Sequence, residues 1–323
     1  MHYMDKEREE SVLAVFSGIL LQVMVPMLLI VGLGAGLHRF FHLDLNTLSK
    51  LNMYVLLPAV AFINVYDSEL NGKVLAAILE FLLLQNSGLI VLSMMMAKLF
   101  KLERSLSAVF QNTIVLNNSG NFGIPVSQLV FHQHPLGATI QIMVTIFQNF
   151  LTNTYGVYQF VSGNGKREKW TAEIWKNPVL HALLLGVVCR WLHISIPSFL
   201  WAPLQRVADA FLAIALFTLG AQIAYARFTA LPPLVYVSVL GRLMVSPLLA
   251  ASLIFLLGMD GVTAQALLIA SSYPCSRNTA LYALEYDCHP DYAAQAVLVS
   301  TLLSAITVTG TVYAARLLFP IGG

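Results

Sequence analysis

Charged side chains are scarce in this sequence of 323 residues: Asp, Glu, Lys and Arg together make up 11% of it. Soluble domains contain about a quarter charged residues, which cover the surface that faces water. The shortage therefore excludes a soluble globular protein of this length. Apolar residues account for 58% and the mean hydropathy is +0.74, so we expect a polytopic protein held in a lipid bilayer.

Cysteine is also rare. Cys189, Cys275 and Cys288 are too few and too far apart for a disulfide framework or a zinc site, and we expect them to be ordinary helix residues. The sequence contains no His-Glu-x-x-His motif and no other metal-ligand cluster, so we predict no metal and no cofactor. The net charge of +2 is close to balance and gives no reason to expect a nucleic-acid partner.

Long apolar runs dominate what is present. A membrane-spanning helix needs roughly 20 apolar residues at a rise of about 1.5 Å per residue, so the chain can hold about ten such helices. We predict an all-α membrane protein with ten spans and short connections. The predicted spans are residues 12–37, 51–66, 74–96, 106–131, 136–161, 178–192, 207–226, 234–259, 262–284 and 292–318.

One sizeable polar stretch separates two sets of five spans. Residues 162–177 read SGNGKREKWTAEIWKN and are rich in Lys and Arg. We therefore divide the chain into a first five-helix repeat (1–161), a loop (162–177) and a second five-helix repeat (178–323). Loops rich in Lys and Arg tend to stay on the cytoplasmic side of a membrane, so this central loop is predicted to be cytoplasmic.

The remaining basic residues support the same orientation. If the N-terminus lies outside, ten Lys and Arg residues fall on the cytoplasmic side and six on the opposite side. This bias favours a cell-membrane protein with both termini extracytoplasmic. The cytoplasmic set is Arg39, Lys50, Lys98, Lys101, Arg104, Lys166, Arg167, Lys169, Lys176 and Arg227, and the outer set is Lys6, Arg8, Lys73, Arg190, Arg206 and Arg316.

An odd number of spans in each half has a consequence for the fold. Two homologous halves must then lie in opposite orientations in the membrane, which is the inverted-repeat arrangement of many secondary transporters. Unusual interruptions fall in the fourth span of each half: residues 117–125 read NNSGNFGIP and residues 271–279 read SSYPCSRNT. The pattern predicts two broken helices, the fourth and the ninth, that cross near the middle of the membrane.

Both interruptions are poor in residues that favour helix. Pro125 and Pro274 lack an N–H, and Gly120 and Gly123 allow the backbone to leave helical geometry. Such backbone persists in a membrane only when it is buried in protein or lines a wet cavity. The N-terminal ends of the half-helices would present free N–H groups to one point, where an anion can bind. The predicted substrate-binding residues are Asn117, Asn118, Gly120, Asn121, Gly123, Pro125, Pro274, Ser276, Arg277 and Asn278.

Three features have competing interpretations. Glycine and proline also serve helix packing in membranes, but the clustering of Asn, Ser, Gly and Pro in two matching places favours a site. Gly32 and Gly36 form a GxxxG pattern, which we interpret as a place where two helices approach. Glu80 and Arg242 are charged residues inside apolar spans. Two interpretations are open for them: a proton or transport role, or an ion pair, either with each other or with another structural partner.

Several stretches resemble a known family. Asn118 followed by Gly-Ile-Pro at 123–125 is similar to the crossover of the auxin efflux carrier family of permeases. Residues 283–291, ALEYDCHPD, resemble its Glu-Tyr-x-x-His-Pro-Asp signature, and residues 56–59 and 216–220 resemble its second and seventh spans. The resemblance covers essentially the whole chain. It relates the sequence to the plant PIN proteins and to the bile acid, arsenite and auxin transporter superfamily.

The resemblance implies ten spans in two inverted repeats, with a scaffold part and an elevator-type transport part. It also implies a secondary transporter for a small organic anion, such as a mono- or dicarboxylate or an auxin-like acid, since family members export auxin or carry malate and malonate. Asn118 would be the polar crossover ligand of the first half and Pro274 the break of the second. Related folds are often dimers, which leaves a homodimer open.

Two features depart from the plant carriers of this family. Arg277 stands in a short stretch where they have no obvious arginine, and a guanidinium there favours a smaller or more anionic substrate than auxin. The loop at 162–177 is short beside their extended regulatory loop, which indicates a compact, bacterial type of permease.

Other classes of protein fit the sequence less well. An intramembrane enzyme needs a nucleophile with its base, or paired carboxylates, within the spans, and the sequence shows neither, so we predict no enzyme. A receptor usually carries a soluble domain, and we find no stretch of the sequence that would form one. A channel fits less well because two helices broken deep in the membrane suit a closed, occluding site better than an open pore. The alternative that we keep is a sodium-coupled organic anion symporter of the bile-acid type, which shares the inverted-repeat plan.

Overall fold

The computed structural model describes residues 17–321, with gaps at residues 19, 68–71, 165–177 and 225–230. Every named element in this part of the chain is a helix. Backbone groups that leave water must find hydrogen-bond partners within the protein, and a helix supplies them along its own length. The all-helical prediction is confirmed.

The helices of the first half include four short π-helical turns, labelled η. They are η1 (Leu20–Met24), α2 (Val25–Phe41), α3 (Leu45–Leu51), η2 (Asn52–Leu56), α4 (Leu57–Asp67), α5 (Gly72–Leu99), α6 (Arg104–Val115), η3 (Ser119–Gly123), α7 (Ile124–Val130), α8 (Pro135–Leu151), η4 (Thr152–Gly156) and α9 (Val157–Asn164). Those of the second half are α11 (Pro178–Trp191), α12 (Ser198–Ile223), α13 (Pro233–Leu240), η5 (Gly241–Val245), α14 (Ser246–Leu256), α15 (Gly261–Ser271), α16 (Arg277–Glu285) and α17 (Pro290–Leu318).

Five of the described helices are long and apolar enough to cross a membrane. They correspond to the second, third, seventh, eighth and tenth predicted spans: Leu45–Asp67, Gly72–Leu99, Ser198–Ala221, Pro233–Leu256 and Pro290–Leu318. The second begins at Leu45 rather than at residue 51, because the Asp44 carboxylate caps α3 by accepting hydrogen bonds from Asn46 N–H at 3.0 Å and from Thr47 Oγ1 at 2.6 Å.

Several sequence predictions fall partly outside the described residues. Residues 12–16 of the first span do so, and its helix ends at Phe41 rather than at residue 37. In the central loop, residues 162–164 belong to α9, and residues 165–177 with their four basic side chains lie outside the description. The same holds for Lys6, Arg8 and Arg227.

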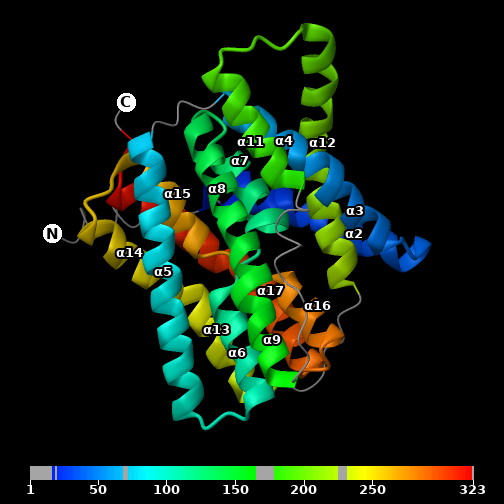
Figure 1. The fold of residues 1–323 in the computed structure, drawn as a ribbon. Coiled ribbons are helices and arrows are strands. Elements are labelled where there is room, and N and C mark those ends of the chain that lie inside the picture. Colours follow the sequence, from blue (N-terminus) through cyan, green and yellow to red (C-terminus); the bar gives the residue numbers. More distant parts are fainter. Residues whose placement is uncertain (1–16, 19, 68–71, 165–177, 225–230, 322–323) are drawn as a thin grey trace, which may run out of the picture.

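The interruptions of the fourth and ninth predicted spans meet inside the molecule. In Figure 1, α6 and α16 lie in the lower half and α7 and α15 in the upper half. An antiparallel bridge pairs Asn117 with Cys275, Asn118 N–H donates to Pro274 O at 2.9 Å, and Ser276 N–H donates to Leu116 O at 3.0 Å. The two breaks thus satisfy part of each other's backbone, as paired strands do.

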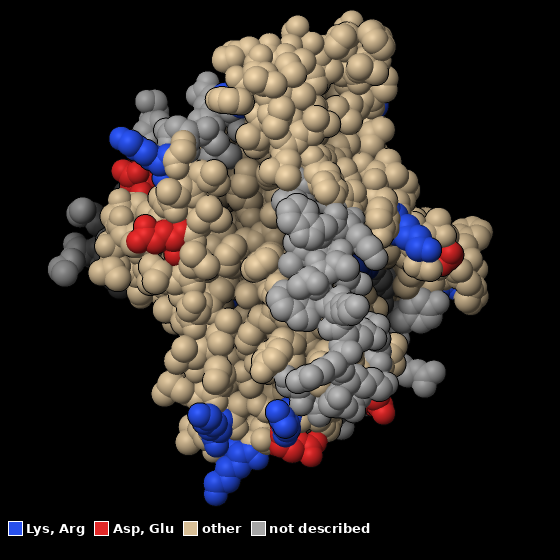
Figure 2. All heavy atoms as spheres, in the orientation of Figure 1, with Lys and Arg blue, Asp and Glu red and all other residues tan. Residues whose placement is uncertain are grey.

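The outer surface is largely apolar. On the face shown in Figure 2, charged atoms gather at the lower end and along the margins, and most of the surface between them belongs to other residues. Phe40 and Leu256 are about four-fifths exposed, at 80% and 79%. Surface of this kind suits contact with hydrocarbon.

Helices α2 and α12 come closest at two glycines. A Cβ on Gly34 would overlap the carbonyl oxygen of Phe217, and a Cβ on Gly220 would overlap that of Val31. Gly32 and Gly36 have open space where a Cβ would lie. The GxxxG interpretation therefore named the wrong residues. The close approach of α2 and α12 depends on Gly34, which lies between Gly32 and Gly36.

We expect Gly34→Ala and Gly220→Ala each to destabilise the protein by about 1–3 kcal/mol, because the added methyl group forces the two backbones apart. Gly32→Ala and Gly36→Ala are matched controls on the same helix. Thermal unfolding in detergent, followed by intrinsic fluorescence, should show a lower melting temperature for the first pair and wild-type values for the second. Equal values for all four would contradict this packing.

Candidate functional site

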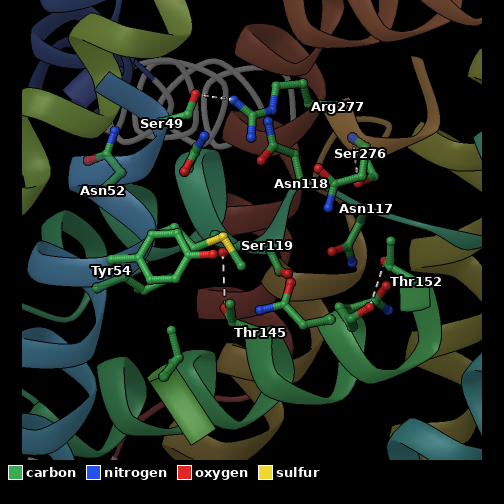
Figure 3. A pocket seen from close by; sticks show the side chains of 18 of the residues that line it. Ser49, Asn52, Tyr54, Asn117, Asn118, Ser119, Thr145, Thr152, Ser276 and Arg277 are labelled. Atoms are coloured by element: carbon green, nitrogen blue, oxygen red, sulfur yellow. Dashed lines mark hydrogen bonds between the residues drawn. The ribbon is translucent and has the colours of Figure 1, made fainter. Parts of the chain in front are cut away.

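A cavity of about 320 Å³ lies beside the two breaks. Seven of the ten predicted substrate-binding residues line it, and Figure 3 shows four of them converging from the two breaks. Those seven are Asn117, Asn118, Gly120, Asn121, Ser276, Arg277 and Asn278. The other three, Gly123, Pro125 and Pro274, are buried outside its lining and shape the backbone instead.

Arg277 is the first residue of α16 and reaches across to α3. Its Nη1 donates to Ser49 Oγ at 3.1 Å, a contact visible in Figure 3. Ser276 caps this helix, because its Oγ accepts from Asn278 N–H at 3.3 Å. A guanidinium has five N–H donors, so the bond to Ser49 leaves donors that can hold a carboxylate at two points.

Asn118 lies immediately before η3 and is only 7% exposed. Its Nδ2 has no hydrogen-bond partner among the described residues. The backbone carbonyl of Asn118 accepts a hydrogen bond from Gly123 N–H at 3.0 Å, which is the first such bond of the helix. The N–H groups of the residues between Asn118 and Gly123 therefore have no acceptor inside the helix. An anion can supply the acceptors that these donors need.

Asn117 has a different task from its neighbour. Its Nδ2 donates to Ala270 O, in the last turn of α15, at 3.2 Å. One of the two N–H donors of its amide is therefore committed to a helix end, and its Oδ1 is an acceptor, which a carboxylate does not bind. We expect Asn117 to hold the break in shape rather than to hold an anion.

The two predicted glycines of the first break differ in their surroundings. A Cβ on Gly123 would lie 2.5 Å from the Tyr273 ring and 2.6 Å from Gln141 Nε2, whereas the nearest atom to a Cβ on Gly120 is Thr145 Cγ2 at 3.8 Å. Gly123 is thus needed for the close approach of η3 to the second break. Pro125 follows directly on η3, so its missing N–H falls inside the continuous helix of η3 and α7 and leaves a carbonyl of the preceding turn without that donor.

Sequence reasoning missed the opposite walls of the cavity. The helix α8 with η4 contributes Thr145, Gln148, Asn149 and Thr152, a spacing of i, i+3, i+4 and i+7 that marks one polar face on an apolar helix. This pattern could have revealed them. The segment of α3 and η2 contributes Asn46, Ser49, Lys50 and Asn52, of which the prediction left the first three in a loop.

The charged side chains of the described lining have one sign. Lys50 and Arg277 are present, and none of the described lining residues is Asp or Glu. The N-terminal ends of η3 and α16, which begin beside this lining, add positive partial charge. The arrangement can attract a small anion and bind it through charge and hydrogen bonds.

Arg242 lies in η5, away from the cavity lining, and is completely buried. It donates to Ile114 O at 2.9 Å and Val115 O at 3.2 Å, and also to Ser246 Oγ and Ser271 O. These contacts do not include Glu80, which is exposed on α5 and also lies outside the lining. The partners of Arg242 are neutral oxygen atoms, so the ion-pair interpretation is wrong for its described contacts.

The cysteines correct a smaller expectation. Cys189 lies in α11 as predicted, but Cys275 lies in the second break, where its Sγ donates to Thr113 O at 3.0 Å. Cys288 lies in the turn between α16 and α17, also outside a helix. All three cysteines are free and buried. His289, which is exposed, pairs with the exposed Glu103 at 2.7 Å.

Comparison with known proteins gives matches along most of the chain. The Membrane transport protein family matches residues 16–174 and 167–312. A protein of Methanothermobacter thermautotrophicus named "Uncharacterized transporter" is 26% identical over 277 residues, which cover 82% of this chain and 87% of that protein.

Two further relatives have more specific names. A putative malonate transporter of Rhizobium meliloti is 26% identical over 196 residues, 56% of this chain and 60% of that protein. Auxin efflux carrier component 2 of Oryza sativa is 26% identical over 142 residues, 40% of this chain and 21% of that protein. The chain therefore belongs to the Membrane transport protein family, the auxin efflux carrier family of permeases whose motifs its sequence carries.

Proposed function

We propose that this protein is a secondary transporter for a small organic anion, a mono- or dicarboxylate, with alternating access at the place where the two interrupted helices meet. The cavity carries the proposal, because its described lining contains Arg277 and Lys50, no carboxylate and the beginnings of two helices. A relative named as a putative malonate transporter supports a dicarboxylate, and one named as an auxin efflux carrier component supports an organic acid.

The proposal includes ten spans in two inverted repeats, with the fourth and ninth spans crossing. The matching interruptions support this plan. Contacts between loops or helix ends that the plan places on the same side of the membrane support it as well. Glu103, between α5 and α6, pairs with His289, between α16 and α17. At the other side, Gln265 near the start of α15 donates to Phe319 O at the end of α17 at 2.7 Å.

The proposed orientation puts both termini outside and the central loop in the cytoplasm. The Lys- and Arg-rich connections support it. In this orientation α3, with Lys50 near its end, lies at the cytoplasmic side of the cavity. An anion would then reach Arg277 from the cytoplasm in the conformation described.

The orientation can be tested at Gly165, in the central loop and outside the described residues. A single cysteine there, in a background that lacks the three native cysteines, should resist an impermeant thiol reagent in intact cells and react after the cells are opened. A second single cysteine at Lys73, predicted to lie outside, is the matched control and should react in intact cells. Labelling of Gly165→Cys in intact cells would invert the proposed orientation.

The binding site can be tested at its two donors. Arg277→Ala should weaken carboxylate binding by about 10- to 150-fold, since a hydrogen bond to a charged group contributes roughly 1.5–3 kcal/mol. Asn118→Ala removes a neutral donor and should have a smaller effect in the same direction. Arg206→Ala, an exposed arginine of α12 outside the lining, is the control.

Calorimetric titration of the purified variants with malonate, as a representative dicarboxylate, measures these effects. Gel filtration should show monodisperse protein in each case, because the helix breaks depend on Pro and Gly rather than on these side chains. If a monodisperse Arg277→Ala protein binds malonate with the wild-type affinity, the proposed site is refuted.

A further inference from the structure

We infer that Arg242 is a fixed counter-cation for the carbonyl ends of both interrupted helices. It occupies a place lined by oxygen atoms where an exchangeable cation could otherwise bind. The role of the arginine at the helix ends does not depend on the proposed function. Its consequence for the coupling of transport rests on that function.

The end of α6 has an almost complete set of donors. Leu116 N–H donates to Asn112 O at 3.0 Å, Cys275 Sγ donates to Thr113 O, and Ser276 N–H donates to Leu116 O. The two carbonyls between them, those of Ile114 and Val115, receive their hydrogen bonds from Arg242 Nη1. The last four carbonyls of a helix have no partner inside it, so these donors replace water.

The end of α15 is satisfied in a similar way. Ser272 donates to Ile269 O from its N–H at 3.0 Å and from its Oγ at 2.7 Å, and Asn117 Nδ2 donates to Ala270 O. Ser271 O, the last carbonyl, accepts from Arg242 Nη2 and from Ser246 Oγ. Among these capping donors, Arg242 is the one that reaches both helices.

The charge of Arg242 is balanced by these helix ends. Its hydrogen-bond partners among the described residues are three backbone carbonyls and one hydroxyl, and the salt bridge found among these residues lies elsewhere. The C-terminal end of a helix carries roughly half a negative elementary charge. Two such ends together amount to about one charge, which is what a single guanidinium neutralises.

The atoms that accept hydrogen bonds from the guanidinium are of the type that binds a hard cation. All four are carbonyl or hydroxyl oxygens, and hard cations prefer oxygen ligands. A metal ion in this position would have to bind from solution and dissociate again, whereas the guanidinium of Arg242 is a permanent part of η5. If the protein transports an anion as proposed, substrate binding should therefore need no sodium.

Thermal unfolding of the full chain in detergent tests the role at the helix ends. The melting temperature of the wild type should be the same in sodium chloride and in N-methylglucamine chloride. Arg242→Ala should melt at a lower temperature, and methylguanidinium should raise that temperature with the logarithm of its concentration once the site fills. Arg206→Ala, which removes an exposed arginine, should melt like the wild type and not respond to methylguanidinium.

Failure of methylguanidinium and of sodium to stabilise a monodisperse Arg242→Ala protein would overturn the inference. Should that variant not fold, Arg242→Lys and Arg242→Met decide. The first retains the charge and the second retains only length, so the lysine variant should melt at the higher temperature. Equal melting temperatures would show that packing, not charge, is what matters there.

Calorimetry with malonate in sodium-free buffer separates the consequence for coupling from the proposed function. Wild-type affinity unchanged by removal of sodium supports the fixed cation. Binding that requires sodium overturns it and leaves the transporter proposal intact. Absence of binding in both buffers counts against the proposed substrate class, and the melting experiments still test Arg242.

Discussion

The backbone at the two helix breaks must find hydrogen-bond partners without water, and this requirement organises the middle of the molecule. The antiparallel bridge between Asn117 and Cys275 joins the breaks directly. The carbonyl ends of α6 and α15 then need donors, which Arg242 and its neighbours supply. The segments that begin after the breaks instead present N–H groups beside a cavity. A single constraint thus separates a side that holds a cation from a side suited to an anion.

Much of this could be predicted because helix-breaking residues act locally. The clusters around Gly123 and Pro274 give the interruptions, and seven of the residues chosen from them line the cavity. The partners of Arg242 could not be predicted, since they come from two segments distant in sequence. The polar face of α8 was present in the sequence as a helical spacing, but each of its residues is unremarkable alone.

The glycines show the same limit. Spacing placed Gly32 and Gly36 on one face of a helix, but which face packs against α12 depends on the neighbouring helix, and it is Gly34 that meets Phe217. In the first break Gly123 lies against Tyr273, whereas Gly120 has room for a methyl group. Sequence identifies residues that permit close approach, and the tertiary fold decides which of them is used.

The proposal that both breaks form one anion site is tested most directly by a crystal structure with a brominated dicarboxylate such as bromomalonate. Its anomalous scattering locates the bromine without reference to the protein. The signal should lie in the cavity between Asn118 and Arg277, with the carboxylate oxygens directed at the beginnings of η3 and α16. A signal found instead in the separate cavity beside Arg190, with the space between the breaks empty, would contradict the site.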